Sequence, residues 1–395
     1  MPRILHLGVG NFFRAHAAAY TQDSPVWSIT GVSFRSSNIR DGLAAQDYTY
    51  ALVIKDRDST KIRAITCLSD IRVAAENPRA IINAVADAQF DVITLTVTEK
   101  AYHLTASGHL NLSAPEIQAD LDGRGTTVVG TLARGLAQRT APVTVLCCDN
   151  LPDNGVKLDR AVCRFATAAH LSLPSHVSFP SCMVDRITPA TTDDLRAEAG
   201  DPMAVPTEAF TEWVIEDRFA AAKPAWPGAQ WVDDVAPHEM RKLRMLNGAH
   251  SLLAYAGIAK GHTYVHEAVA DPDLRSRATA LMSEAAATLP PRMQAQAQAY
   301  ADALIVRFEN PNLRHRLQQI AMDGSQKIPI RILATLQDRQ GADSPALSHA
   351  LDAWIAFVRA EVAAGRALDD PRASDLVAAS KSKNPDRALR ALISA

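Results

Sequence analysis

The chain has 395 residues, of which 47% are hydrophobic and 21% charged, as in an ordinary globular protein. Its 41 Lys and Arg residues and 43 Asp and Glu residues give a formal net charge of −2, without the positive excess of proteins that bind nucleic acid. No run of about 18 apolar residues occurs, so no membrane-spanning helix is expected.

The first 180 or so residues alternate β-branched runs with alanine-rich stretches. Strands are expected at 3–7, 26–34, 51–56, 61–70, 90–99 and 142–150. Helices are expected at 11–23, 78–87, 114–139 and 154–169. This alternation predicts an α/β domain, in which a Rossmann-like, doubly wound parallel sheet carries helices on both faces.

The pattern changes beyond Pro189, where long alanine-rich helical segments dominate. They are expected at 238–258, 272–288, 293–308, 312–322, 344–363 and 373–380. We therefore predict a first domain over residues 1–185 and a second, mainly α-helical domain over residues 186–395.

The cysteines are Cys67, Cys147, Cys148, Cys163 and Cys182. Their number is odd and no CxxC pair occurs, so we expect no disulfide framework and a cytoplasmic location. Cys147 and Cys148 lie in the apolar run VTVLCCDN and are expected to be buried strand residues. The N-terminus enters a glycine turn at once, so no signal peptide is expected.

Gly8-x-Gly10 stands between the first expected strand and the first expected helix. Glycines at this junction let the backbone approach a pyrophosphate, which the free N–H groups of the helix then bind. Phe13 replaces the third glycine of the G-x-G-x-x-G fingerprint, and an ordinary tight turn is the alternative. The position of the turn favours a dinucleotide site, which makes residues 1–185 a dinucleotide-binding domain.

The choice between NAD and NADP stays open. An acid at the end of the second strand would bind the ribose 2′-OH of NAD, but the chain reads Phe34-Arg35-Ser36-Ser37-Asn38 and has no acid before Asp41. Arg35 or Arg40 could instead face a 2′-phosphate, or Arg35 could be a solvated loop residue.

Residues 237–257, PHEMRKLRMLNGAHSLLAYAG, are expected to form a largely buried helix. At 100° per residue and with Lys242 at zero, three other polar residues fall within one arc of about 140°. They are Glu239 at about 60°, His250 at about 80° and Asn247 at about 140°. Polar groups on one face of a buried helix must be paired or must line a cleft.

Two interpretations of this face remain open. In the first, Lys242 pairs with a carboxylate and His250 makes a hydrogen bond in the core. In the second, Lys242 is a general base, because burial lowers the pKa of a lysine toward neutrality. Asn247 and His250 would then hold the same oxygen as hydrogen-bond donors.

Asn150 follows the buried strand VTVLCCDN, and ligands of parallel sheets bind outside the carboxyl ends of the strands. The alternative is that Asp149 and Asn150 cap a helix or form a turn.

No metal site is expected. His262 and His266 are four residues apart, but Thr263 stands where H-E-x-x-H has its acid. The chain also lacks G-x-S-x-G and G-K-[ST], so serine hydrolase and P-loop functions are not expected.

Eight segments, in order and over nearly the whole chain, resemble the long-chain mannitol dehydrogenase family. They are GVGNFFRAH (8–16), TVTEKAY (96–102), CDNLPDNG (148–155), FPSCMVDRITPATT (179–192), FTEWVIEDRF (210–219), EMRKLRMLNGAHSLLAY (239–255), RFENPNLRHRL (307–317) and MDGSQKIPIRIL (322–333). The family includes mannitol 2-dehydrogenase, fructuronate reductase, tagaturonate reductase and arabinitol dehydrogenase.

The resemblance implies a zinc-independent, NAD(P)-dependent secondary-alcohol dehydrogenase with a Rossmann domain and a mainly helical C-terminal domain. It implies that Lys242 is the catalytic acid/base. It further implies that Asn150 and Asn247 polarise the reacting oxygen and that His250 binds substrate.

The resemblance assigns supporting roles to other residues. Asp185 would orient the site, Glu239 would lie on the proton path from Lys242 to solvent, and Lys327 would contact substrate. The cofactor-binding residues expected from the turn, the end of the second strand and the matching segments are Gly8, Gly10, Asn11, Phe12, Arg35, Thr98 and Glu99.

The chain departs from the family pattern in three places. Family members commonly carry an N-terminal extension before the first strand, and none is expected here. Ser37 and Asn38 stand where many members have an acid, which leaves strict NAD preference in doubt. Ala101 replaces the glycine of TEKGY, which could alter a turn near the nicotinamide.

We therefore expect an enzyme whose partner is a small polyol, ketose or sugar acid, with hydride transfer of the mannitol/fructose type as the first choice. The nearest alternative is a hexuronate reductase that acts on D-fructuronate and D-mannonate. A more remote alternative is a nucleotide-binding regulator without catalysis.

Overall fold

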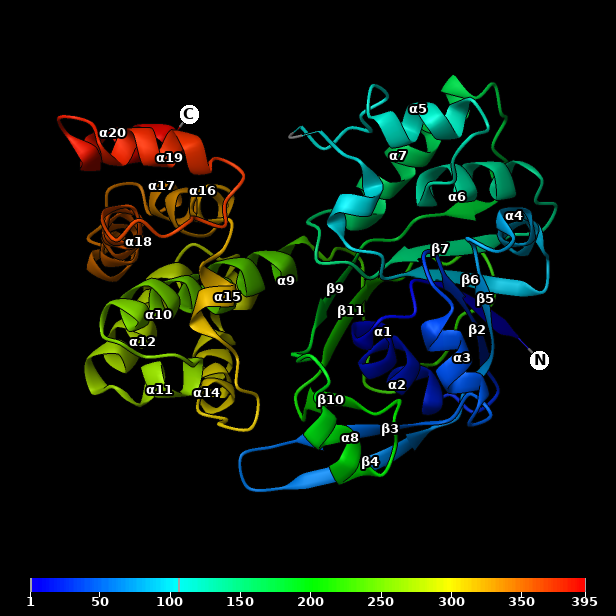
Figure 1. Ribbon diagram of the computed structural model, residues 1–395, viewed down its shortest axis with the longest axis horizontal. Coiled ribbons are helices and arrows are strands. Elements are labelled where there is room, and N and C mark those ends of the chain that lie inside the picture. Colours follow the sequence, from blue (N-terminus) through cyan, green and yellow to red (C-terminus); the bar gives the residue numbers. More distant parts are fainter. Residues whose placement is uncertain (1, 106, 395) are drawn as a thin grey trace. The chain divides into compact units, whose positions relative to one another are not determined.

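The computed structural model describes residues 2–105 and 107–394, and the chain forms two compact units, Met1–Ala236 and Pro237–Ala395 (Figure 1). The division lies later in the chain than the expected boundary between residues 185 and 186. The physical reason is strand pairing, because the strands that follow residue 185 join sheets of the first unit.

The first unit contains a six-stranded parallel sheet with the strand order β5-β2-β1-β6-β7-β8. Its strands are β1 (Arg3–Leu7), β2 (Ser28–Ser33), β5 (Leu68–Val73), β6 (Phe90–Leu95), β7 (Val143–Cys147) and β8 (Val177–Ser178). The connections leave β1 in opposite directions toward β2 and β6, as in a dinucleotide-binding sheet. The predicted doubly wound α/β fold is confirmed.

Helices cover both faces of this sheet (Figure 1). One face carries α1 (Asn11–Ala15), α2 (Ala17–Gln22) and α3 (Asn38–Ala44). The other carries α4 (Pro78–Ala86), α5 (Pro115–Leu121), α6 (Val128–Ala137) and α7 (Asn154–Ala168). Side chains of β1 alternate between two cores, with Ile4 in one and Leu5 and Leu7 in the other.

Two expected elements are each divided in the structure. The run 61–70 covers most of β4 (Thr60–Ile65) and the start of β5, which belong to different sheets. The expected helix 114–139 is α5 and α6, separated by a turn in which Gly123 has φ of 74°. The buried carboxylate of Asp120 closes this turn by accepting hydrogen bonds from the N–H and hydroxyl of Thr127 at 2.7 and 2.6 Å.

Two three-stranded sheets complete the first unit, and four of their strands were not expected from the sequence. Their orders are β10-β3-β4 and β12-β11-β9. The strands are β3 (Tyr50–Lys55), β9 (Cys182–Asp185), β10 (Val205–Glu208), β11 (Glu212–Glu216) and β12 (Gln230–Val232), with α8 (Asp193–Ala199) between β9 and β10. Because β10 pairs in parallel with β3, this segment is tied to the N-terminal part of the chain.

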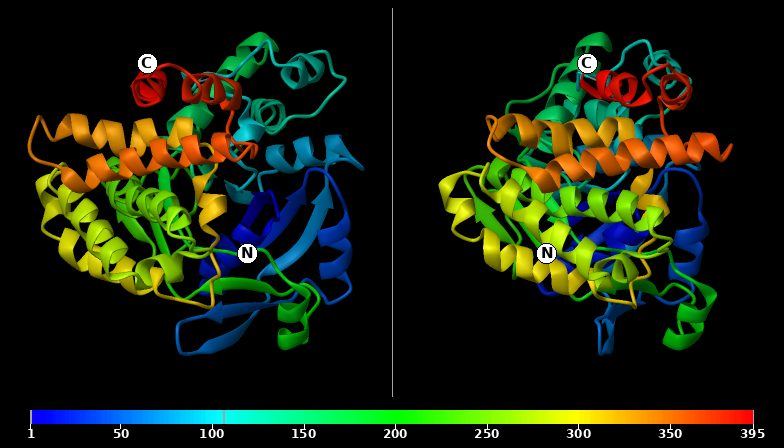
Figure 2. Two further views of the ribbon diagram at one scale, coloured as in Figure 1. Left: turned by 60° about the vertical axis from the view of Figure 1, so that its left-hand side comes forward. Right: turned by 90° about the vertical axis from the view of Figure 1, so that its left-hand side faces the viewer.

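The second unit is helical, as predicted (Figures 1 and 2). Its α-helices are α9 (Ala236–Arg241), α10 (Gly248–Ala259), α11 (Val265–Ala270), α12 (Pro272–Ala286), α13 (Pro291–Gln294), α14 (Ala297–Phe308), α15 (Leu317–Ala321), α16 (Gly324–Ile328), α17 (Ala334–Asp338), α18 (Pro345–Ala363), α19 (Ala373–Ser380) and α20 (Pro385–Ser394). Among its described helices, none is long and apolar enough to cross a membrane, and the same holds for those of the first unit.

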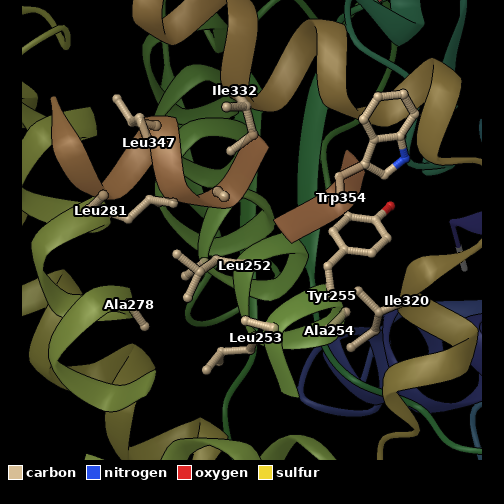
Figure 3. Packing of buried hydrophobic residues seen from close by; sticks show 14 of the residues in the cluster. Leu252, Leu253, Ala254, Tyr255, Ala278, Leu281, Ile320, Ile332, Leu347 and Trp354 are labelled. Carbon is tan, nitrogen blue, oxygen red and sulfur yellow. The ribbon is translucent and has the colours of Figure 1, made fainter. Parts of the chain in front are cut away.

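Helix α10 is the centre of the second core. It packs against α11, α12, α15 and α18. In Figure 3, Leu252 of α10 lies toward Leu281 of α12 and Leu347 of α18, while Tyr255 lies beside Trp354 of α18. This helix is therefore covered by apolar side chains along most of its length.

Two π-helical turns interrupt the helices of the second unit. Residues Lys242–Asn247 form the first, between α9 and α10, and Pro329–Leu333 form the second, between α16 and α17. Pro329 lacks the N–H that a regular helix needs, which explains the second irregularity. The two turns pack against each other, and such turns are frequent at functional sites.

The packing of α6 against α4 can be tested at Gly135. A β-carbon there would lie 2.4 Å from Cβ and Cγ1 of Val85 and 2.8 Å from the carbonyl oxygen of Ile82. Gly135→Ala should therefore destabilise the protein by about 1–3 kcal/mol, seen as a lower urea midpoint. In the control Gly42→Ala, the three atoms nearest to the added carbon all belong to the flexible side chain of Met203, which can move aside, so the midpoint should change little. An unchanged midpoint in Gly135→Ala would contradict this packing.

Candidate active site

The glycine turn after β1 is built for close backbone approach. Gly8 has φ of 104°, and a β-carbon on it would lie 2.1 Å from the carbonyl oxygen of Thr96, so only glycine fits. At Gly10 no atom lies within 4 Å of the place where a β-carbon would stand. The backbone therefore borders an open cradle, as the pyrophosphate of a dinucleotide requires.

A cavity of about 880 Å³ lies against this turn within the first unit. Gly8, Gly10, Arg35 and Thr98 line it, as the cofactor prediction requires. Its volume is within the range of cofactor sites, so the residues present fit a bound dinucleotide.

The other predicted cofactor residues have different surroundings. The Asn11 amide donates to Thr191 Oγ1 at 3.1 Å, and its oxygen accepts from Arg14 at 2.6 Å. Phe12 stacks on His16 with ring centroids 5.1 Å apart. Glu99 is exposed and begins a 3₁₀ helix that ends at Tyr102. Their roles in cofactor binding stay predictions.

The carboxylate of Asp149 fixes the loop that follows β6. It accepts hydrogen bonds from the N–H groups of Val97 and Thr98 at 3.0 and 2.9 Å, and from the Tyr102 hydroxyl at 2.6 Å. Burial raises the pKa of Asp149, and these three hydrogen bonds act in the opposite direction. They also hold Thr98 at φ of 76°, a conformation that threonine rarely adopts.

A buried histidine supports the same region from below. Nδ1 of His6 lies 2.7 Å from Thr94 Oγ1, and its Nε2 lies 3.0 Å from Thr96 Oγ1 and 3.1 Å from the Gly8 carbonyl oxygen. Burial lowers the pKa of His6 to about 3, so the ring is neutral at pH 7. Strand β1 thus fixes the glycine turn through side chains as well as through its ladder.

Two further predicted site residues belong to the first unit. Asn150 is exposed just beyond the carboxyl end of β7, where ligands of parallel sheets bind. Asp185 is buried at the end of β9, opposite Glu212 of β11. Their expected roles are not tested by these positions.

In the second unit, Lys242 begins the first π turn, Asn247 ends it, and His250 lies in the first turn of α10. The assumed rotation of 100° per residue does not hold across this segment, because a π turn contains an extra residue. The charge of Lys242 still contributes to the lowered pKa of His250, so these two side chains lie within electrostatic range of each other.

His250 is buried, with 7% of its surface exposed. Its ring centroid lies 4.6 Å from that of Phe308 and 5.3 Å from that of His315. Within residues 2–105 and 107–394, its Nε2 has no hydrogen-bond partner. A buried nitrogen without a hydrogen-bond partner costs free energy of folding, unless a bound ligand supplies that partner.

Burial holds the pKa of His250 well below its usual value, so the ring is neutral at pH 7. Neighbouring titratable groups lower it further, and at pH 7 the charged ones among them are Arg307, Arg331 and Lys242. Burial and Arg307 also lower the pKa of His315 to about 4. The surroundings of His250 are therefore rich in cationic groups.

Arg331 connects the two π turns. It lies in the second turn, and its Nη1 donates to Ser251 Oγ at 3.2 Å and to the carbonyl oxygen of Asn247 at 3.4 Å. No role in the site was predicted for Arg331, Arg307 or His315. They stand in matching segments, but nothing in their spacing places them beside His250.

Lys327 and Glu239 were predicted as supporting residues. Nζ of Lys327 donates to the carbonyl oxygen of Met322 at 2.6 Å and lies 3.4 Å from that of Ile320, so it stabilises the end of α15. Glu239 is half-buried on α9, in the helical turn before Lys242. A substrate contact for Lys327 and a proton path through Glu239 stay predictions.

Metal ligands were also sought. Among the described residues, no group of three or more His, Cys, Asp or Glu side chains could hold a metal ion. His262 lies 3.8 Å from Asp271, and His266 stacks on Tyr264.

Comparisons with known proteins agree with these two units. The model of the mannitol dehydrogenase Rossmann domain matches residues 2–228, and that of the mannitol dehydrogenase C-terminal domain matches residues 234–394. The D-mannonate oxidoreductase of Escherichia coli (strain K12) is 39% identical over 399 residues, which cover 93% of this chain and 82% of that protein.

Two mannitol 2-dehydrogenases are also similar. That of Phaeosphaeria nodorum is 36% identical over 410 residues, which cover 95% of this chain and 72% of that protein. The solved ternary complex of the Pseudomonas fluorescens enzyme with NAD and D-mannitol has a TM-score of 0.84 at 33% identity, and covers 100% of this chain and 91% of that chain.

The Rossmann-like sheet, its glycine turn and these matches define a nicotinamide-dependent oxidoreductase that acts on CH–OH groups. The chain belongs to the mannitol dehydrogenase family.

The loop fixed by Asp149 can be tested through cofactor affinity. Asp149→Asn keeps the shape but replaces one accepting oxygen by an amide, so the loop that carries Thr98 should loosen. We expect the dissociation constant for NADH or NADPH to rise about tenfold or more, measured by nucleotide fluorescence. Asp122→Asn is the matched control, because Asp122 is exposed and pairs only with Arg124 among the described contacts, at 2.6 Å. Equal affinity in Asp149→Asn and the control would contradict this role.

Proposed function

We propose that this enzyme transfers hydride reversibly between a nicotinamide dinucleotide and the carbinol carbon of a linear polyol or ketose of the mannitol/fructose type. The observation that carries the proposal is the polar cluster at the start of α10. There Lys242 lies close enough to act electrostatically on a buried, neutral His250 whose Nε2 has no partner in the described chain.

The proton step falls to Lys242. The nicotinamide, when bound, supplies the acceptor or donor of the hydride. In alcohol oxidation, neutral Nζ of Lys242 takes the hydroxyl proton as the C–H bond breaks, and in reduction the ammonium returns it to the carbonyl oxygen. A neutral His250 Nε2 can share a hydrogen bond with a substrate hydroxyl, which would satisfy the buried nitrogen.

The reacting oxygen of the substrate becomes negative during this step, so it needs hydrogen-bond donors. We propose that the Asn247 amide is one of them, since it ends the π turn that begins at Lys242. Asn150 is proposed as the second donor, Asp185 as an orienting residue and Glu239 as a proton carrier. We also propose that the reaction is zinc-independent.

A hexuronate reductase is the second candidate, and one observation favours it. The carboxylate of a sugar acid needs cationic partners, and Arg307 and Arg331 both act on His250 from nearby. A relative at 39% identity is named as a D-mannonate oxidoreductase. A nucleotide-binding regulator without catalysis remains the third candidate, and it predicts cofactor binding without turnover.

We propose that the protein is located in the cytoplasm. All five cysteines are free, and three of them, Cys147, Cys148 and Cys182, are buried. Free cysteines are typical of a reducing compartment.

Lys242→Ala tests the mechanism. A positioned acid/base contributes about 10²–10⁴-fold, so kcat should fall by that factor at neutral pH. Lys260→Ala is the control, because Lys260 lies in the same unit and pairs with Asp271 and Asp273 at 2.9 Å. Retention of a tenth of the wild-type kcat in Lys242→Ala would rule out the general-base role.

Initial rates of NADH and NADPH oxidation with D-fructose and D-fructuronate separate the two enzyme candidates. We expect turnover of fructose, since the first candidate needs only hydroxyl recognition. Activity on fructuronate alone would replace it by the second candidate. Absence of turnover on both, and on mannitol and mannonate in reverse, would favour the regulator.

A further inference from the structure

The end of β2 bears on which dinucleotide the first unit binds. In a Rossmann sheet, the residues just after the second strand meet the adenosine ribose. A carboxylate there accepts hydrogen bonds from the 2′-OH of NAD, whereas an arginine accommodates the 2′-phosphate of NADP. Strand β2 ends at Ser33, and α3 begins at Asn38, so Phe34 to Ser37 form this loop.

No carboxylate of the described chain lines the cavity at this loop. On this side the lining comes from Ser33, Phe34, Arg35, Ile39 and the segment that follows β5. The one acid in the lining is Glu116 of α5, which lies 3.7 Å from His103. The 2′-OH acceptor of NAD-binding sites is therefore missing at the end of β2.

The first acid after β2 is already engaged. Asp41 pairs with Arg40 at 2.8 Å and also accepts a hydrogen bond from Ser37. These interactions hold the pKa of Asp41 below its usual value. Its carboxylate therefore already has partners at the start of α3. Arg40 in turn pairs with Glu76 as well, which balances its charge with two carboxylates.

Arg35 differs from Arg40 in its exposure, in its position at the cavity and in its ion pairing. It is exposed, it lines the cavity, and it has no ion pair with any described residue. The loop that carries it is ordered locally, because Ser33 Oγ donates to the carbonyl oxygen of Ser36 at 2.7 Å. Lys100, another cation of the lining, follows β6, on the opposite side of β1 from β2.

We infer that the cavity of the first unit selects a dinucleotide with a 2′-phosphate, NADP(H), and that Arg35 binds that phosphate. A guanidinium can bind a phosphate through two parallel hydrogen bonds, which suits it to this role. The inference rests on the proposed function only in taking this cavity as the cofactor site. It removes Arg40 from the two candidates that the sequence left open.

Calorimetric titration of the full-length protein with NADP⁺ and NAD⁺ tests the inference without turnover. We expect NADP⁺ to bind at least about tenfold more tightly than NAD⁺. Arg35→Ala should weaken NADP⁺ binding about 10- to 100-fold and leave NAD⁺ binding within about twofold. Arg160→Ala, on the exposed side of α7, is the matched control and should change neither.

A second variant tests the same loop in the opposite direction. Ser36→Asp adds a carboxylate beside Arg35, so NADP⁺ should bind more weakly and NAD⁺ at least as well as in the wild type. Equal or tighter binding of NAD⁺ by the wild type, or equal loss of both nucleotides in Arg35→Ala, would overturn the inference. Binding of neither nucleotide would overturn it together with the cofactor assignment. Selective NADP⁺ binding without turnover would support it and contradict the proposed function.

Discussion

The burial of α10 is the constraint on which the second unit depends. Every residue from Gly248 to Gly257 is buried, because helices pack around this segment from several sides. A polar side chain at its start cannot reach bulk water, so its chemistry is set by its neighbours. His250 is neutral for this reason, and the charges of Lys242 and Arg331 in the adjoining π turns lower its pKa further. The same packing that stabilises the helix therefore keeps the ring of His250 largely out of water, within reach of cationic groups.

In the first unit, the main constraint is that the backbone beside the cavity is held in conformations that most residues disfavour. Gly8 and Thr98 both have positive φ, and both border the nucleotide cavity. Glycine adopts a positive φ without strain, so Gly8 needs no further support. Thr98 does need support, and its N–H donates a hydrogen bond to the carboxylate of Asp149, which keeps the loop in place. Buried His6 ties β1 to the same region through hydroxyl groups. These contacts are local to the carboxyl ends of the parallel strands, where the sheet topology places its ligand.

The sequence predicted the elements whose signal is local. Buried parallel strands such as β6 and β7 are mostly apolar and rich in β-branched residues, and the glycine turn follows directly from its position after β1. Strands β10 and β12 were missed because each is short and its partner decides its conformation, as β10 depends on distant β3. For the site, the polar residues of 239–250 stood out against an apolar segment. Arg331 did not, and Asp149 was considered only as part of a helix cap or turn, since their contacts join residues that lie far apart in the chain.

The pH dependence of kcat for alcohol oxidation, compared between the wild type and Lys242→Ala, tests the central claim most directly. If Lys242 is the base, the wild-type rate falls with slope one as the base becomes protonated, and the residual rate of the variant lacks that limb. A variant that keeps the same acidic limb would place the base on another residue and contradict the account.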